Sequence, residues 1–256
     1  MKEKKSILSP RERRQRNREE MKNAILEAAR QVMREEGVAA LNLQEVARRV
    51  GVRAPSLYEY FPGKMAIYDA LFLMGVRLYT ERMNRFTEST DSFWGRAQAG
   101  LENYMMFAQE YPELYQLVQE RPVPGFVPSE ESMQESRGLL TMTDAIVEKG
   151  IERGSLALGI TVAQARDLFL AMMHGLTALH MANEPELPAG SGRFGSLLPA
   201  ALALFRVLST YSIGTKYIAE LYGERAREGS MRDWDKLWLG HLFDSGHLIP
   251  RLESAL

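Results

Sequence analysis

Apolar residues recur three, four and seven positions apart along almost the whole chain, and this spacing is the period of an α-helix. No segment shows the alternation of β-branched and polar residues that marks a half-buried strand. The sequence therefore predicts an all-α fold. The chain has 256 residues, 45% of them hydrophobic, which is enough for one large domain or two smaller ones.

The helical pattern is clearest in the first third of the chain. Apolar residues from Met21 to Met33 form one stripe, and Gly37 follows where a glycine commonly ends a helix. Asn42 is a favourable N-cap for the next helix, and Glu45 stands three residues after it, as in a capping box. This second helix is expected to bury Leu43, Val46, Ala47 and Val50.

A glycine turn separates the second helix from a third. Gly51 permits a sharp turn, and a short helix is predicted at about 54–60, with Pro55 tolerated in its first turn. Two short helices joined in this way form a helix-turn-helix. A long helix is expected from about Gly63, and later helices at about 93–109, 112–119, 130–153, 162–182, 196–212, 214–228 and 231–243. The stretches 121–129 and 183–193 are predicted loops because proline and glycine are frequent there.

Charge is distributed unevenly along the chain. Residues 1–64 hold 15 lysines and arginines against 9 acidic residues, a net charge of +6, and the remaining residues hold 17 against 24, a net charge of −7. A basic head on an acidic body suits a chain whose one end approaches a polyanion. A solvated basic tail explains the same pattern, so charge alone leaves both interpretations open.

In a helix-turn-helix the second helix enters the major groove of DNA, and the first crosses the phosphate backbone. Here Leu57 and Phe61, four residues apart, are expected to face the interior of the domain. The candidates for DNA contacts are Gln44, Arg53, Ala54, Pro55, Ser56, Tyr58, Tyr60 and Lys64.

The chemistry of these side chains fits the role. Arg53 can pair with guanine or bind a phosphate, and the hydroxyls of Ser56 and Tyr58 suit phosphate oxygens. Ala54 or Pro55 can touch a thymine methyl group. Core packing is the competing interpretation for the tyrosines.

The stretch from Leu41 to Leu71 resembles the DNA-binding signature of the TetR family of repressors, including a Leu-Tyr-x-x-Phe-x-x-Lys segment that ends at Lys64. The resemblance implies a bacterial transcription repressor, and by position it implicates Gln44, Ala54, Pro55, Ser56, Tyr58, Tyr60 and Lys64. Two residues depart from the pattern. Leu43 stands where the family usually has a phosphate-binding Thr or Ser, and Glu59 is an acid on a DNA-facing helix, where we expect it to point to solvent.

The rest of the chain resembles the branch of this family whose C-terminal domain is named for a Trp-His-Gly motif. The segment from Tyr104 to Tyr115 is similar to one in that branch, and Met173-His174-Gly175 stands at the motif, without its Trp. By this resemblance the helices at 162–182 and 196–212 form a four-helix bundle with a second chain. The expected dimer interface is Leu168, Met172, Leu176, Leu179, Leu198, Ala201, Leu202, Phe205 and Leu208. A core within one chain explains the same apolar stripes.

An effector pocket is expected in the same body, lined by aromatic and methionine side chains of the kind that small apolar ligands use. The candidates are Phe86, Trp94, Tyr104, Phe107, Tyr111, Tyr115, Phe126, Met142, Met172 and His174. Such residues at helical spacing also suit an ordinary core, and His174 also suits a satisfied packing histidine.

Together these features predict four segments. Residues 1–17 are a disordered basic tail, 18–64 a helix-turn-helix DNA-binding domain, 65–212 a helical effector-binding and dimerisation domain, and 213–256 a helical extension. The predicted function is a repressor that binds a pseudo-palindromic operator as a homodimer and is released by a small, apolar effector. A DNA-binding regulator controlled by a protein partner is the first alternative, and a helical enzyme with a vestigial helix-turn-helix is the second.

Several other classes of protein are disfavoured. The chain has no cysteine, which rules out disulfides and thiol chemistry. No apolar run is long enough to cross a bilayer and no export signal follows the N-terminal charges, so we expect a cytoplasmic, nucleoid-associated protein with no membrane partner. No cofactor, metal or catalytic residue is expected, because the four histidines lack zinc spacing and the G-x-G-x-x-G match at 190–195 follows a helix.

Overall fold

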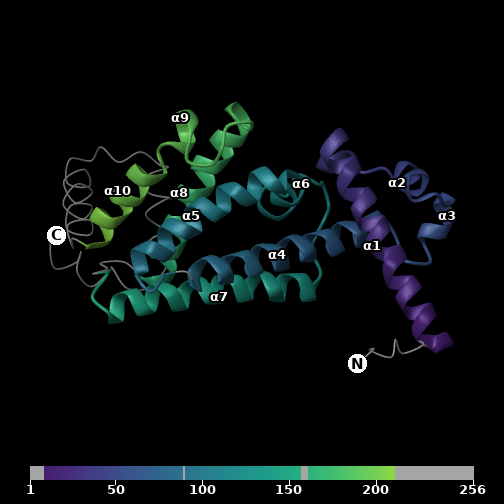
Figure 1. Cartoon of the computed structure of the whole chain (residues 1–256), viewed down its shortest axis with the longest axis horizontal. Helices are drawn as coiled ribbons and strands as arrows, with labels where there is room; N and C mark the ends of the chain where they lie inside the picture. The colour runs from purple at the N-terminus through teal and green to yellow at the C-terminus, as the bar shows by residue number, and fades with distance from the viewer. Residues whose placement is uncertain (1–8, 89, 157–160, 211–256) are drawn as a thin grey trace, which may run out of the picture. The chain divides into compact units, whose positions relative to one another are not determined.

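The structure is a computed structural model and describes residues 9–88, 90–156 and 161–210. Every regular element in these ranges is helical (Figure 1), which confirms the all-α prediction. Two compact units divide the described residues: one holds 9–143 with 172–199, and the other holds 144–171 with 200–210. The elements are α1 (Pro10–Glu36), η1 (Val38–Ala40), α2 (Leu43–Val50), α3 (Ala54–Leu57), α4 (Lys64–Glu88), α5 (Phe93–Glu110), α6 (Pro112–Tyr115), η2 (Gln116–Glu120), α7 (Glu130–Glu152), α8 (Val162–Asn183), α9 (Gly192–Gly195) and α10 (Leu198–Thr210).

Helix α1 begins earlier than the sequence predicted. Residues 10–17, expected to belong to a disordered tail, form its first two turns. The reason is a capping box at Ser9: its hydroxyl accepts from the amide of Glu12, and its own amide donates to the Glu12 carboxylate. Pro10 adds a preset φ at the first helical position. At the other end Gly37, with φ of 96°, ends the helix as expected.

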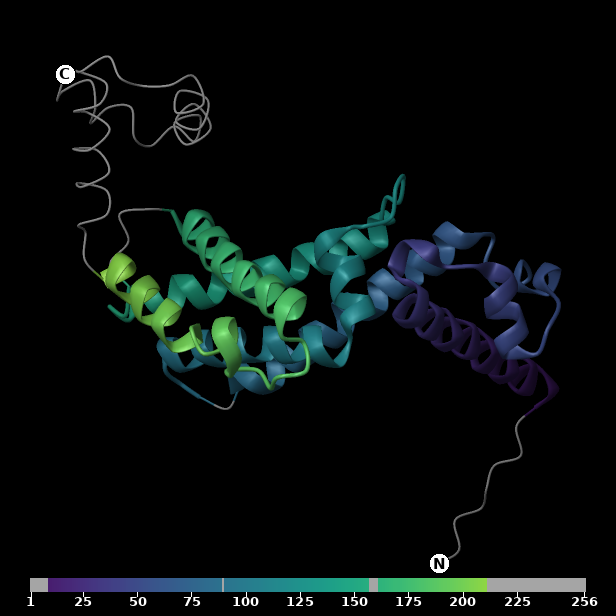
Figure 2. The ribbon, with the colours of Figure 1, turned by 90° about the horizontal axis from the view of Figure 1, so that it is seen from above.

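Both ends of helix α2 are capped. The Asn42 side chain accepts from the amide of Gln44 at 2.9 Å, and Gly51 closes the helix in the left-handed conformation. The predicted capping box with Glu45 is wrong, because that carboxylate accepts hydrogen bonds from Arg48 and Arg49 instead. Helix α2 packs against both α1 and α3, and the three helices make a small N-terminal cluster (Figure 2).

Helix α3 is shorter than the predicted 54–60. It ends at Leu57, and residues 58–60 form turns with hydrogen bonds from residue i+3 to residue i. Leu57 and Phe61 are both buried, as predicted.

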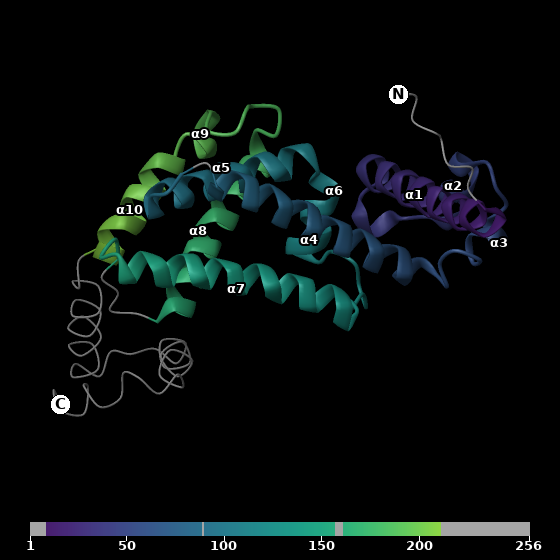
Figure 3. The ribbon, with the colours of Figure 1, turned by 60° about the horizontal axis from the view of Figure 1, so that its bottom comes forward.

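Helix α4 continues from this cluster into the body, where it packs against α5, α6 and η2 (Figure 3). Gly75 permits a close approach, since a Cβ there would lie 3.0 Å from Cγ2 of Val118. Two further contacts tie α4 to the chain around the start of α7. The Asp69 carboxylate accepts from the amide of Ser129 at 2.8 Å, and Arg77 pairs with Glu135 at 2.9 Å.

One predicted helix is divided in the structure: the one expected at 112–119 is α6 followed by the π-helical η2. The helix expected at 196–212 is α10, which begins two residues later, and the short helix α9 takes up the end of the loop predicted at 183–193. Pro199 fits only in the first turn of a helix, which explains why α10 starts at Leu198. The helices predicted at 214–228 and 231–243 lie outside the described residues. None of the described helices is long and apolar enough to span a membrane.

Candidate nucleic-acid interface and effector site

The predicted DNA contacts surround the first turn of α3, the reading helix. Leu57 and Phe61 anchor it in the core and leave its other side chains at the surface. Tyr58 is 57% exposed, so it does not pack the interior in this structure. Gln44, Arg53 and Pro55 are exposed as well, and Ala54, Ser56, Tyr60 and Lys64 are half-buried.

Two of these residues have partners within the chain. The Arg18 guanidinium lies over the Tyr60 ring, 5.4 Å from its centroid, and donates to the carbonyl of Glu59 at 2.7 Å. Lys64 donates to the carbonyl of Ala39 at 3.3 Å. Glu59 itself is exposed, as expected. Arg18 was missed because it stands 41 residues before Glu59, and nothing local in the sequence signals that contact.

An ion-pair network joins α2 to the end of α1. Arg49 bridges Glu45 at 2.7 Å and Glu35 at 2.6 Å, and Arg48 also binds Glu45 at 2.7 Å. Hydrogen bonds from Arg48 and Arg49 lower the pKa of Glu45 to about 2. The network therefore fixes the helix that precedes the reading helix.

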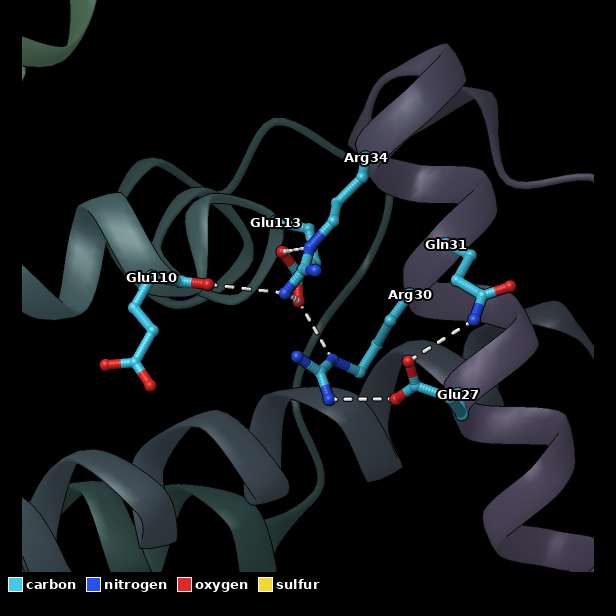
Figure 4. Close-up of polar contacts among 6 residues, drawn as sticks. All are labelled: Glu27, Arg30, Gln31, Arg34, Glu110 and Glu113. Atoms are coloured by element: carbon cyan, nitrogen blue, oxygen red, sulfur yellow. Dashed lines mark hydrogen bonds and ion pairs between the residues drawn. The ribbon is translucent and has the colours of Figure 1, made fainter. Parts of the chain in front are cut away.

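A second set of ion pairs joins α1 to the body, and it centres on Glu113 of α6 (Figure 4). The Glu113 side chain is fully buried and accepts from Arg30 at 2.8 Å and from Arg34 at 2.6 Å. Arg34 also donates to the carbonyl of Glu110 at 3.3 Å, and Arg30 pairs with Glu27 at 3.0 Å. The hydrogen bond to Glu113 raises the pKa of Arg34. A buried carboxylate is thus held by two arginines of the helix that supports the DNA-binding cluster.

Tyr111, predicted for the effector pocket, packs against Phe107 and also contacts this junction. Its ring lies 5.4 Å from the guanidinium of Arg30 and 6.0 Å from that of Arg82. Arg82 in turn pairs with the Glu110 carboxylate and donates to Asn103. Tyr111 is drawn there because an aromatic face stabilises a nearby cation.

Three predicted pocket residues do come together inside the body. The hydroxyls of Tyr104 and Tyr115 lie 3.1 Å and 3.2 Å from the same Nδ1 atom of His174. Burial raises the pKa of both tyrosines, so they stay protonated at neutral pH. The two hydroxyls also hydrogen-bond to each other, so Tyr104, Tyr115 and His174 form one connected polar cluster.

The other predicted pocket residues are dispersed. Phe107 packs beside this cluster against Tyr79, with ring centroids 5.3 Å apart. Phe126 packs against Tyr68 and Phe72 of α4. The half-buried candidates are Phe86, Trp94, Met142 and Met172.

Some residues predicted for the dimer interface are exposed or half-buried, and others are buried within the chain. On α8, Leu168 and Leu179 are 43% and 46% exposed, and Met172 and Leu176 are half-buried. On α10, Ala201 and Leu202 are half-buried. Leu198 and Phe205 are buried within the chain, Phe205 against Phe169 at 5.3 Å, so they serve its own interior. The side chain of Leu208 lies outside the described residues.

Comparison with known families agrees with this anatomy. Residues 25–71 match the family model described as "Bacterial regulatory proteins, tetR family", and residues 97–202 match the one described as "Tetracyclin repressor-like, C-terminal domain". Within residues 9–88, 90–156 and 161–210, no group of three or more histidine, aspartate and glutamate side chains is placed to hold a metal ion.

Two curated proteins are similar over part of the chain. The transcriptional activator FasR of Mycolicibacterium smegmatis is 28% identical over 101 residues, which are 40% of this chain and 46% of FasR. The transcriptional repressor DrrR1 of Streptomyces coeruleorubidus is 31% identical over 106 residues, 40% of this chain and 36% of DrrR1. The match thus spans less than half the length of either relative.

Solved structures share the fold over most of their length. A protein of unknown function from Rhodococcus sp. RHA1 has a TM-score of 0.64 at 21% identity, covering 75% of this chain and 96% of its own. FadR from Bacillus subtilis, in complex with stearoyl-CoA, has a TM-score of 0.59 at 19% identity, covering 73% and 98%. At this identity the likeness shows the fold alone.

Proposed function

Because this chain belongs to the TetR family of bacterial regulatory proteins, which are DNA-binding transcription regulators and not enzymes, we propose that it represses transcription by binding a pseudo-palindromic operator as a homodimer. The observation that carries the proposal is the first turn of α3, whose polar side chains are at the surface while Leu57 and Phe61 fix its position. Two such helices would enter successive major grooves about 34–36 Å apart.

The proposed contacts are the predicted ones, with two roles refined by the structure. Arg53, Ser56 and Tyr58 contact bases and phosphates directly. Lys64 and Tyr60 lie within hydrogen-bond or ring distance of the chain's own groups, so they bind phosphate only by sharing or exchanging those contacts.

We further propose that a small, largely apolar effector binds beside Tyr104, Tyr115 and His174. The rings of Tyr79 and Phe107 pack beside this cluster, and the two tyrosine hydroxyls and His174 supply polar groups there. Thr177 lies one helical turn after His174, and its buried hydroxyl has no hydrogen-bond partner among the residues that the structure describes. A ligand with an apolar body and one polar group would pack against the rings and hydrogen-bond to one of these groups. The place of His174 also supports assignment to the Trp-His-Gly branch.

Helix α6 would carry the effector's signal to the DNA-binding cluster. It has only four residues, and it holds Tyr115 of the tyrosine cluster and Glu113 of the ion pairs with α1. A ligand that displaces Tyr115 therefore strains the hold on Arg30 and Arg34. A coupling of about 1–3 kcal/mol between the two sites is enough to change operator occupancy.

Selection of bound duplexes from a random pool tests the DNA-binding part directly. The wild-type chain should enrich a two-fold symmetric site and protect both half-sites in a footprint. The triple variant S56A/Y58A/K64A should remain folded by circular dichroism and lose operator affinity by at least about 100-fold, since each lost contact costs about 1–3 kcal/mol. Protection of a single half-site would contradict the homodimer, and undiminished affinity would contradict the assignment of α3.

A compound panel tests the effector part. It should include long-chain acyl-CoAs, because FadR of the same fold was solved with stearoyl-CoA. Release of the operator by a compound in the wild type, and not in the variant H174A, supports the proposal. The alternative is control by a protein partner through residues 213–256: deletion of that segment would then abolish regulation, and no compound would change operator binding.

A further inference from the structure

We propose that the N-terminal turns of α1 form a second DNA contact, in which Arg11 and Arg14 bind backbone phosphates beside the reading helix. The inference rests on the proposed function and extends it to a surface outside the predicted DNA-binding domain, residues 18–64. It also changes what the basic head of the chain does: these arginines become an ordered part of the interface, rather than a solvated tail.

Helical spacing places these arginines on the face that meets the reading segment. Arg11, Arg14 and Arg18 are spaced i, i+3 and i+7, so they lie on one face of α1. Arg18 identifies that face, because it contacts the carbonyl of Glu59 and the ring of Tyr60. Arg14 and Arg11 therefore lie about 6 Å and about 10 Å farther along the same face.

The charges of Arg11 and Arg14 are not neutralised by neighbouring carboxylates in the described part of the chain. Both are exposed, and no ion pair joins either of them to a carboxylate in the part of the chain that the structure describes. The nearby acidic residues are engaged elsewhere: Glu12 binds Ser9, Glu19 binds Gln15 and Lys22, and Glu20 binds Arg16.

The surface is also ordered before any partner arrives. The capping box at Ser9 fixes the first turn of α1, so residues 10–18 present five arginines against one glutamate on a helix. Ordering in advance removes the entropy cost that a disordered arm would meet on binding.

Charge and position together select duplex DNA as the partner. About 10 Å of B-form duplex carries about six phosphate charges, so a phosphate lies within reach of each arginine wherever the duplex passes. The surface continues directly from Tyr60 and the reading helix, which must already lie against DNA. The acidic body of a second chain is the competing occupant.

Salt dependence of DNA binding tests the proposal with a control on the same helix. The variant R11A/R14A removes the proposed contacts, and R13A/R16A removes the same number of charges from the opposite face. Alanine favours helix, so both variants keep α1. Binding is measured with the full chain by fluorescence anisotropy at several KCl concentrations. Two duplexes are used, one selected from a random pool by the wild type and one with the scrambled sequence.

For R11A/R14A the negative slope of log affinity against log salt should become shallower by about 3 to 4, because four phosphate contacts per dimer are lost. Affinity near 0.1 M KCl should fall about tenfold or more on both duplexes alike, because phosphate contacts carry no sequence information. R13A/R16A should keep a slope within about one of the wild type. R11K/R14K, which keeps the charges, should have nearly the same salt dependence of DNA affinity as the wild type.

Several results would overturn the proposal. One is an unchanged slope in R11A/R14A, and another is an equal fall in R13A/R16A. A third is a loss of dimer in sedimentation by R11A/R14A, which would assign the face to a partner chain. Failure of the proposed function would give a different result: the wild type would not bind the selected duplex more tightly than the scrambled one.

Discussion

At the scale of single residues, Glu113 has the largest electrostatic consequence. Its carboxylate is fully buried, and ion pairs with Arg30 and Arg34 are what make that burial tolerable. Those arginines come from α1 and the carboxylate from α6, so these ion pairs join the DNA-binding cluster to the body alongside the packing of α1 on α4 and α6.

Replacing Glu113 by Gln should lower the free energy of unfolding by about 2 kcal/mol. The full cost of breaking a buried pair is about 3–5 kcal/mol, and it is reduced here because Arg34 is partly exposed and Arg30 keeps Glu27. Urea unfolding measures the change. Glu110→Gln is the control: Glu110 is an exposed partner of Arg82, and its loss should cost less than about 1 kcal/mol. Equal losses in the two variants would contradict a special role for Glu113.

Glu45 gives the DNA-binding cluster a defined response to acid. Its pKa is about 2 in the folded chain, because Arg48 and Arg49 donate hydrogen bonds to it, against an ordinary value of 4.5. A lowered pKa stabilises the fold above pH 4.5, and that contribution is lost as the pH falls toward 2. The stability advantage of wild type over Glu45→Gln should therefore be constant near neutral pH and disappear between about pH 4.5 and 2. Denaturant titrations over this range test it, and an advantage that persists at pH 2 would contradict the assignment.

At the scale of elements, the extra turns of α1 depend on the cap at Ser9. Removal of an N-cap typically costs about 1 kcal/mol and frays the first turn. Ser9→Ala should therefore speed amide hydrogen exchange roughly fivefold at residues 12–14, while residues 25–33, in the part of α1 that is packed into the core, keep their protection. Uniform loss of protection along α1 would instead mean that the helix opens as one unit.

Helix ends were predictable from the sequence where a cap or glycine marks them locally. Gly37, Asn42 and Gly51 signal the bounds of α1 and α2, and the structure has them in those roles. The start of α1 was missed because charged residues with little apolar content outweighed the capping signal of Ser9 and Glu12.

The candidate sites were predictable only in part. Exposure of the residues around α3 follows from helical spacing and two buried anchors, so local pattern was sufficient. The contacts of Arg18 with Glu59 and of Arg34 with Glu113 join residues 41 and 79 positions apart, and only tertiary packing defines them. The same applies to the contacts of Tyr111 with Arg30 and of Phe126 with Tyr68.

At the scale of the whole molecule, the proposed function requires two chains, and α8 has a face that would join them. Leu168, Ala171, Gly175, Leu179 and Ala182 follow one another at steps of three and four residues along α8. Both leucines and both alanines are exposed in the single chain, and Gly175 is half-buried. A continuous apolar face with small residues between leucines permits close packing of a second helix.

Introducing charge on this face should separate the chains. In Leu168→Glu/Leu179→Glu each chain would bury two unpaired carboxylates in the dimer, and since one buried unpaired charge costs several kcal/mol, dimerisation should weaken by at least about 100-fold. Leu140→Glu on α7, another exposed leucine, should leave the dimer intact. Sedimentation velocity measures the state of assembly, and anisotropy measures operator binding, which should fall together with it because one chain reads only one half-site. A double variant that remains dimeric would exclude the α8 face, whereas a monomer with full operator affinity would leave the dimer without a role in DNA recognition.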